Sequence, residues 1–208
     1  DYLMAICGTK LFKSDNLDGA MDDITGSLTI TTGADKIWTH SQMNNLSIFV
    51  GGAPDAPIKW SGTGNGAVLG GTPPNGEFGI VANRRLFIGN TSANPSRIYW
   101  SILGDPEDWS GTGSGTQDVG LNDGDTLVGA SVVGLDTMLL FKQNSVHMLN
   151  IRTAPFPLYP LFTGVGAISK RGFVNVDGVV YFITAEPRMK ATDGTNVISF
   201  PDSIDNIW

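Results

Sequence analysis

The chain has 208 residues, a formal net charge of −7, 27 glycines, 11 prolines and only 16% charged residues. The acidic balance disfavours non-specific capture of DNA or RNA through phosphate contacts, and a single cysteine, Cys7, excludes an internal disulfide. No apolar run approaches the ~18 residues of a membrane span. Abundant Gly and Pro predict many short strands joined by tight turns.

Five segments along the chain share one plan, in which a short apolar strand leads through a tight turn to a second apolar strand. The segments are residues 3–13, 46–60, 78–100, 137–150 and 179–199. In chain order, the centres of their second strands are separated by 47, 40, 48 and 51 positions. These separations surround the repeat length of a β-propeller blade.

The second and third segments also match residue by residue. The matching parts are residues 48–51 and 58–61 in the second segment, and residues 86–89 and 98–101 in the third. Each match ends on a Trp-Ser pair, and Trp60 and Trp100 lie 40 positions apart. The recurrence favours packing within a blade, because a repeated unit stacks on its neighbours. The alternative is a set of exposed aromatic rings that stack on sugars.

The pattern therefore predicts an all-β fold, a propeller-like array of about five antiparallel blades that is not necessarily complete. We expect one domain over residues 1–208, and because the chain begins in a strand-like run at Asp1 rather than at Met, we expect a segment of a longer polypeptide. The expected blade-like units are residues 1–45, 46–77, 78–125, 126–170 and 171–208. Further strands are expected at residues 27–31, 36–39, 126–130 and 173–176.

Three connecting segments are candidates for contacts between blades or between subunits. Gly-rich stretches at residues 61–76 and 110–115 each contain the tetrapeptide Ser-Gly-Thr-Gly and are expected to be loops. Residues 105–109 predict a short helical corner with Asp105 as N-cap and Pro106 in the first position. Residues 154–161 contain three prolines, which exclude a central strand and favour an extended surface segment.

No pattern of residues predicts catalysis. Asp118, Asp123 and Asp125 supply oxygen ligands of the kind that calcium prefers, but the EF-hand order and its distal Glu are absent, so a tight turn is the favoured interpretation. A sialidase-type Asp-box is absent, as are a nucleophile motif and a metal-spaced partner for His40 or His147. The sequence therefore predicts no enzyme, no metal and no cofactor.

One stretch resembles a known family. Residues 85–90, 94–101 and 103–109, followed by residues 122–125 and 139–146, resemble the tail nozzle proteins of short-tailed phages, also called tail tubular protein B or tail accessory factor. In that family a strand ending in Gly precedes an Asn-Pro turn and a Tyr-Trp-Ser strand. A Gly-Asp-Pro-Glu-x-Trp corner and a Phe-Lys-x-Asn-Ser strand come next.

The resemblance implies a structural protein of the virion tail without enzymatic activity. Family members form a sixfold ring of copies beside portal, adaptor and other tail proteins, and double-stranded DNA passes through the ring without specific binding. The alternative function is a carbohydrate-binding propeller module for recognition of the host surface. The candidate structural and interface residues are Trp60, Trp100, Asp105, Pro106, Trp109, Pro155, Pro157 and Pro160.

Overall fold

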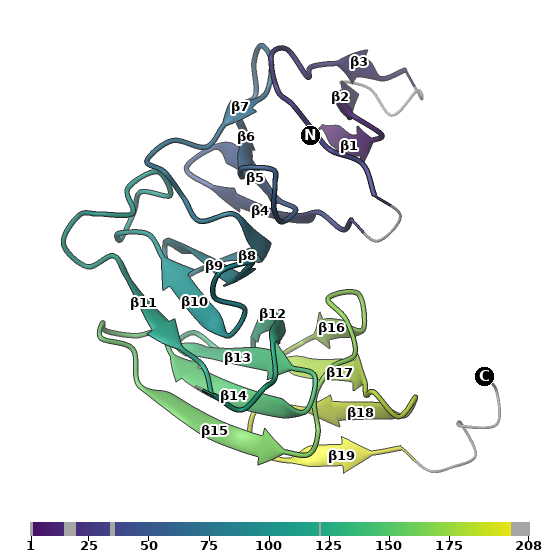
Figure 1. Ribbon diagram of the computed structural model, residues 1–208, viewed down its shortest axis with the longest axis vertical. Coiled ribbons are helices and arrows are strands. Elements are labelled where there is room, and N and C mark those ends of the chain that lie inside the picture. The colour runs from purple at the N-terminus through teal and green to yellow at the C-terminus, as the bar shows by residue number, and fades with distance from the viewer. Residues whose placement is uncertain (1, 15–19, 34–35, 121, 201–208) are drawn as a thin grey trace.

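The computed structural model describes residues 2–14, 20–33, 36–120 and 122–200. Within these residues the chain forms nineteen strands and no helix, arranged as five separate antiparallel sheets. The sheets follow one another along an arc, and the first and last sheets lie on opposite sides of an opening (Figure 1). The predicted all-β array is therefore present.

The first sheet has three strands and each of the others has four. The first contains β1 (Leu3–Cys7), β2 (Lys10–Ser14) and β3 (Asp22–Asp23). The second contains β4 (Thr39–Met43), β5 (Leu46–Val50), β6 (Ile58–Trp60) and β7 (Ala67–Val68). The third contains β8 (Gly76–Ala82), β9 (Arg85–Thr91), β10 (Arg97–Trp100) and β11 (Gly115–Asp118).

The fourth sheet contains β12 (Leu127–Val132), β13 (Thr137–Lys142), β14 (Ser145–Asn150) and β15 (Leu158–Thr163). The fifth contains β16 (Phe173–Val176), β17 (Val179–Ile183), β18 (Met189–Thr192) and β19 (Val197–Ser199). Strands are paired in chain order within every sheet. The first strands of the four-stranded sheets, β4, β8, β12 and β16, lie towards the inside of the arc (Figure 1) and contact one another in that order.

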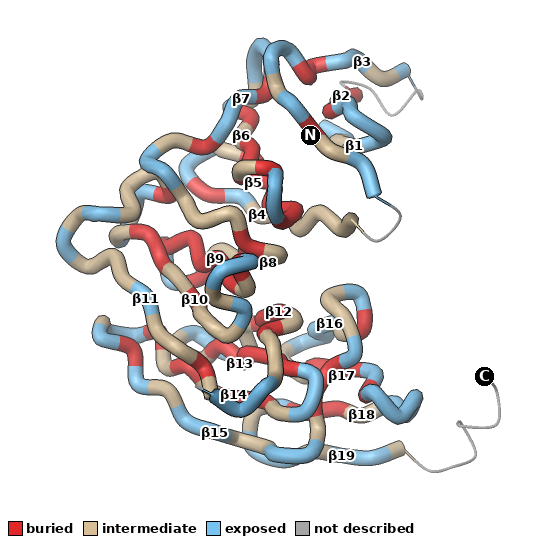
Figure 2. The backbone as a smooth tube through the Cα atoms, in the orientation of Figure 1, coloured by how far each residue is buried: buried red, intermediate tan, exposed pale blue. Residues whose placement is uncertain are grey.

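The core is divided into four hydrophobic clusters, one at each junction between consecutive sheets. Buried residues concentrate in the middle strands of the sheets (Figure 2). On β13, Met138 and Leu140 belong to the cluster shared with the third sheet, whereas Leu139 and Phe141 belong to the cluster shared with the fifth. Because successive side chains point to opposite faces of a strand, an unbroken apolar run is what a sheet buried on both faces requires.

The sheet boundaries correct the expected units at the beginning of the chain. The expected first unit ended at residue 45, but residues 39–43 form β4, the first strand of the second sheet. All five residues of β4 pair with β5 through a tight turn at Asn44 and Asn45, both of which have positive φ. The polar Thr-His-Ser-Gln run of β4 concealed this strand because it lacks the apolar pattern of the others.

The strand expected at residues 27–31 is not formed, and residues 36–38 are also irregular. The backbone N–H of Thr31 donates to the carboxylate of Asp55 at 3.1 Å, and the Thr31 hydroxyl donates to it at 2.9 Å. The Lys36 ammonium lies 2.5 Å from the same carboxylate, which is only 3% exposed. This segment therefore satisfies its polar groups with a buried aspartate instead of a neighbouring strand. The strands expected near residues 126–130 and 173–176 are present as β12 and β16.

Candidate functional site

Trp60 and Trp100 are packing residues with the same anchor. They are 3% and 5% exposed. Trp60 lies in the hydrophobic cluster between the first and second sheets, and Trp100 lies in the cluster between the third and fourth sheets. Trp60 Nε1–H donates to the carbonyl of Gly64 at 3.0 Å, and Trp100 Nε1–H donates to that of Gly113 at 3.1 Å. Gly64 and Gly113 are each the last residue of a Ser-Gly-Thr-Gly tetrapeptide. In both sheets, therefore, the repeated tetrapeptide Ser-Gly-Thr-Gly accepts the hydrogen bond of the repeated tryptophan.

Residues 105–109 do not form the expected helix, but contain a turn at residues 106–107 and a bend at Trp109. The Asp105 carboxylate accepts a hydrogen bond from the N–H of Glu107 at 2.8 Å, and the Trp109 indole N–H donates to the carbonyl of Pro106 at 2.9 Å. These two bonds close the chain on itself within five residues, which leaves no room for a helical ladder. Pro106 is buried and Asp105 is exposed.

The same corner joins the third sheet to the second. The Glu107 carboxylate accepts hydrogen bonds at 2.6 Å from the Lys59 ammonium and from the N–H of Gly70. A Cβ atom on Gly71 would lie 1.5 Å from the Glu107 carbonyl oxygen, so only glycine allows this approach. The Trp109 ring packs against the hydrophobic cluster between the two sheets. The corner is thus an inter-sheet clamp.

Burial alone would raise the pKa of the Glu107 carboxyl, but its bonds to Lys59 and Gly70 dominate and lower the pKa below the ordinary 4.5. Replacing Glu107 with alanine should therefore lower the free energy of unfolding by about 2 kcal/mol at pH 7. Because the folded-state pKa is depressed, the difference from wild type is complete above pH 4.5 and disappears as the pH falls through the folded-state value. Urea unfolding at several pH values measures it.

The exposed Glu186 provides the control for that experiment. Glu186→Ala should change the free energy of unfolding by no more than about 0.5 kcal/mol. Equal effects of the two substitutions would show that the clamp contributes nothing specific.

A second set of polar residues joins the third and fourth sheets. The Lys142 side chain is completely buried, and its ammonium lies 2.6 Å from the Asp123 carboxylate and 2.9 Å from the Val119 carbonyl. The Asp125 carboxylate accepts hydrogen bonds from the backbone N–H groups of Gln143 at 3.1 Å and Asn144 at 2.8 Å. These aspartates therefore fix the connection between the two sheets. The sequence analysis favoured a tight turn here over a calcium site, and the structure adds that two of its carboxylates bind the fourth sheet.

The Asn94-Pro95 turn contributes to the same junction. Its Pro95 carbonyl accepts a hydrogen bond from the N–H of Leu127 at 2.9 Å, and the Ser96 hydroxyl donates to the Asp125 carbonyl. Asp118 forms a bidentate pair with Arg97, at 2.6 and 3.0 Å, within the third sheet. In the part of the chain that the structure describes, no group of three or more His, Cys, Asp or Glu residues is placed to hold a metal ion.

The proline-rich segment lies between the third and fourth sheets. Pro155 precedes Phe156, a 2% exposed ring whose centroid lies 5.0 Å from that of Trp100 and 5.7 Å from that of Phe87. The Pro157 carbonyl accepts a hydrogen bond from the N–H of Asn150 at 2.9 Å. Pro160 lies in β15, an edge strand, where the pairing register with β14 shifts. Sequence reasoning expected an extended surface segment here and missed Phe156, whose ring is buried between the two sheets.

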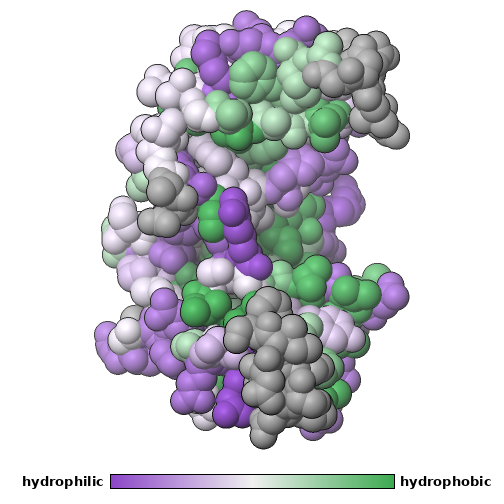
Figure 3. Space-filling model, turned by 90° about the vertical axis from the view of Figure 1, so that its right-hand side faces the viewer, coloured by the Kyte–Doolittle hydropathy of each residue, from purple (hydrophilic) through white to green (hydrophobic). Residues whose placement is uncertain are grey.

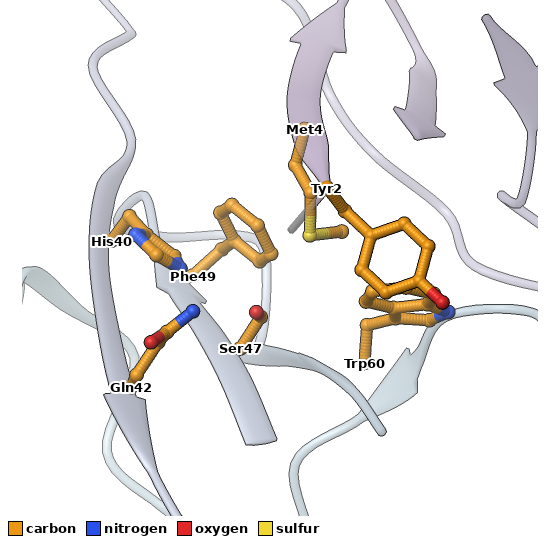
Figure 4. Close-up of a pocket in the computed structure, with 7 residues that line it drawn as sticks. All are labelled: Tyr2, Met4, His40, Gln42, Ser47, Phe49 and Trp60. Carbon is orange, nitrogen blue, oxygen red and sulfur yellow. The ribbon is translucent and has the colours of Figure 1, made fainter. Parts of the chain in front are cut away.

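A cavity of about 630 Å³ lies between the first and second sheets. The side chains of His40 and Gln42 come from β4, those of Ser47 and Phe49 from β5, and Trp60 lies below the ring of Tyr2 (Figure 4). The Tyr2 and Trp60 rings meet edge to face with centroids 5.0 Å apart. Burial lowers the pKa of His40. No Asp, Glu, Lys or Arg lines this cavity. Sequence reasoning gave no indication of it, because its polar residues belong to the unrecognised strand β4.

Comparisons with known proteins identify the fold. No family model matches the chain, and no curated protein matches it in sequence. Among solved structures, BamB from Moraxella catarrhalis is similar, with a TM-score of 0.51 and 11% sequence identity. The match covers 94% of this chain and 59% of the BamB chain, so this chain spans well under two thirds of that protein. At this identity the likeness concerns architecture, and the chain is an all-β, propeller-like array of antiparallel sheets.

Proposed function

We propose that the chain is a non-enzymatic structural component of a short-tailed phage tail, in a nozzle or adaptor ring that forms part of the DNA ejection conduit. One observation supports this proposal above all. The motifs that resemble the nozzle family lie at the two central junctions between sheets, and their polar side chains are used there in bonds between or beside sheets.

The proposed role is to hold adjacent sheets at a fixed angle. Glu107 connects the corner to the second sheet, and Lys142 and Asp125 connect the fourth sheet to the chain that leaves the third. Buried and fully bonded polar groups make an array rigid, because any rotation at a junction would leave them without partners. A rigid wall with a net charge of −7 suits a conduit that DNA passes without being held.

The carbohydrate-binding alternative receives less support. Stacking on a sugar needs an open aromatic face, whereas Trp60 and Trp100 are almost fully buried.

The proposal predicts that the chain occurs in virions, in several copies around the tail axis. An electron cryomicroscopy map of the intact phage particle, together with mass spectrometry of purified particles, tests it. We expect five-sheet arcs repeated in a ring beside the portal or its adaptor. Absence of the chain from purified particles, or a single copy away from the axis, would contradict the proposal. The same particles after DNA release should retain the ring.

A further inference from the structure

The junction of the third and fourth sheets encloses two basic side chains. Strongly hydrophilic residues lie at many places on the surface that is seen from the open side of the arc (Figure 3). By contrast, the side chain of Lys142 is completely buried and His147 is 8% exposed. A basic group is rarely buried without a partner of opposite charge, so the contacts of these two residues determine how the junction responds to protonation.

The strand register places the two side chains on the same face of the fourth sheet. His147 on β14 is paired with Leu140 on β13, and Lys142 lies two positions further along β13. Paired residues, and residues two positions apart in one strand, point to the same face of a sheet. Leu140 belongs to the hydrophobic cluster between the third and fourth sheets, so both basic groups face this junction as diagonal neighbours.

The two carboxylates beside this pair are already engaged in other bonds. Each oxygen of Asp123 lies 2.6 Å from Nζ of Lys142. The Asp125 carboxylate accepts hydrogen bonds from three backbone N–H groups, at distances between 2.8 and 3.1 Å. Among the described residues, neither carboxylate is hydrogen-bonded to His147. A protonated imidazole would therefore have to draw a carboxylate away from bonds that it already makes.

The remaining contacts of His147 offer no counter-charge. Its Nε2 atom lies 3.2 Å from the hydroxyl oxygen of Ser145, and a hydroxyl group supplies a dipole but no charge. On the other side of β14, the strand β15 contains no charged residue, and its one titratable residue, Tyr159, points to the opposite face because it is paired with Met148. The cluster that packs against this face from the third sheet is apolar. The charged groups that act on the ring are thus Lys142, Asp123 and Asp125.

The folded junction favours the neutral imidazole. Burial lowers the pKa of His147 below the ordinary 6.5 and the Lys142 ammonium lowers it further, whereas Asp123 and Asp125 raise it without prevailing. Between this lowered pKa and 6.5, the unfolded chain binds a proton that the folded chain does not. The stabilisation that depends on the neutral ring is therefore complete above pH 6.5 and decreases as the pH falls below it.

We propose that His147 makes this junction a pH-sensitive joint, which is fixed while the imidazole is neutral and loosens when the imidazole is protonated. In the protonated state two buried cations compete for the Asp123 carboxylate, and one of them is left without a counter-charge, which destabilises the junction. The bonds between Asp125 and the β13–β14 turn lie next to this competition and weaken with it. The joint does not depend on a role in a phage tail, so either proposal can fail without the other.

A proton NMR titration of the intact chain tests the direction of the effect. The imidazole signal of His147 should titrate with a midpoint below 6.5, and it is identified by its absence from the spectrum of His147→Gln. A midpoint at or above 6.5 would overturn the proposal, because the aspartates would then stabilise the protonated ring in the folded chain.

Hydrogen exchange tests whether the junction responds to the same proton. The N–H groups of Gln143 and Asn144, which donate to Asp125, should open up to about tenfold more often at pH 5.5 than at pH 7.5, after correction for intrinsic exchange rates. His147→Gln keeps a polar side chain but cannot titrate, so this difference should disappear. His40→Gln, which removes the other histidine from the cavity between the first and second sheets, is the matched control and should retain it. An equal pH response in the wild type and His147→Gln would refute the joint.

Lys142→Met distinguishes competition between the two cations from a purely structural role of the lysine. Without the ammonium, Asp123 is available to the imidazolium, so the pKa of His147 should be higher than in the wild type and the acid response weaker. Arg97→Met, which removes a cation paired with Asp118 inside the third sheet, is the control and should leave the titration unchanged. An unchanged pKa of His147 in folded Lys142→Met would contradict the proposal, because the two cations would then not share Asp123.

Discussion

Replacing Asp123 with alanine lowers the free energy of unfolding by about 3 kcal/mol at pH 7, because it leaves the buried Lys142 ammonium without its counter-charge. The two groups lie 2.6 Å apart, and the lysine side chain is 0% exposed. The Val119 carbonyl remains as a partner, but a carbonyl dipole cannot replace a carboxylate in a buried site. Equilibrium unfolding in urea measures the loss.

Asp118→Ala is the matched control, because Asp118 also pairs with a cation at 2.6 Å, but both side chains of the Arg97–Asp118 pair are 31% exposed. Its loss should cost about 0.5 kcal/mol. A double variant, Asp123→Ala with Lys142→Met, should recover much of the stability, since it removes the buried charge itself. Equal effects of the two single substitutions, or no recovery in the double variant, would contradict the assigned role of Lys142.

The pH dependence of the Asp123 effect has a definite sign. Burial alone would raise the pKa of this carboxyl, but the Lys142 ammonium and the N–H of Asp125 lower it below the ordinary 3.8. The carboxylate therefore contributes its full stabilisation above pH 3.8, and the contribution is lost as the pH falls through the folded-state pKa. The difference between wild type and Asp123→Ala should shrink only in strong acid.

Truncating Phe156 to alanine is expected to lower the free energy of unfolding by about 4 kcal/mol, as for other large-to-small changes in a core. The ring packs against Phe87 and Trp100, and the Arg85 guanidinium lies 5.7 Å from its centroid. Removing it opens a cavity at the junction of the third and fourth sheets. Thermal unfolding followed by calorimetry or far-ultraviolet circular dichroism measures the effect.

Tyr159→Ala is the control for Phe156→Ala. It tests whether truncating any aromatic side chain of the proline-rich segment destabilises the fold, or only the one buried between the sheets. Tyr159 is 50% exposed in the edge strand β15, and its loss should cost less than about 1 kcal/mol. A Tyr159 effect as large as the Phe156 effect would mean that the segment is held by its strand pairing and not by the buried ring.

The sequence predicts the sheets well wherever both faces are buried. The runs at residues 86–88 and 138–141 are unbroken apolar stretches because alternate residues enter two different clusters. Strand β4 escaped detection because one end of its sheet is uncovered, so His40 and Gln42 lack the apolar signal. Local sequence patterns reflect burial, and β4, which lines the open cavity, has few buried residues.

The residues of the junctions were recognisable as motifs, but their partners were not. Asp123 and Lys142 are nineteen positions apart, and Lys59 and Glu107 are forty-eight apart. Such pairings depend on how sheets stack, which no local pattern encodes. Asp55 is a similar case. Its carboxylate accepts hydrogen bonds from Thr31, in the segment 27–31 where a strand was expected, and these bonds take the place of pairing with a neighbouring strand.

The indole hydrogen bonds of Trp60 and Trp100 show how this architecture accommodates inserted residues. The bond from Trp60 reaches a carbonyl four residues ahead, whereas the equivalent bond from Trp100 reaches one thirteen residues ahead. The nine additional residues include the corner that clamps the second sheet, yet the indole retains the same partner in the same tetrapeptide. A gene for such a module can gain or lose an entire loop while the register of its sheet is preserved. Insertions at this point are therefore a route by which otherwise similar modules acquire different neighbours during evolution.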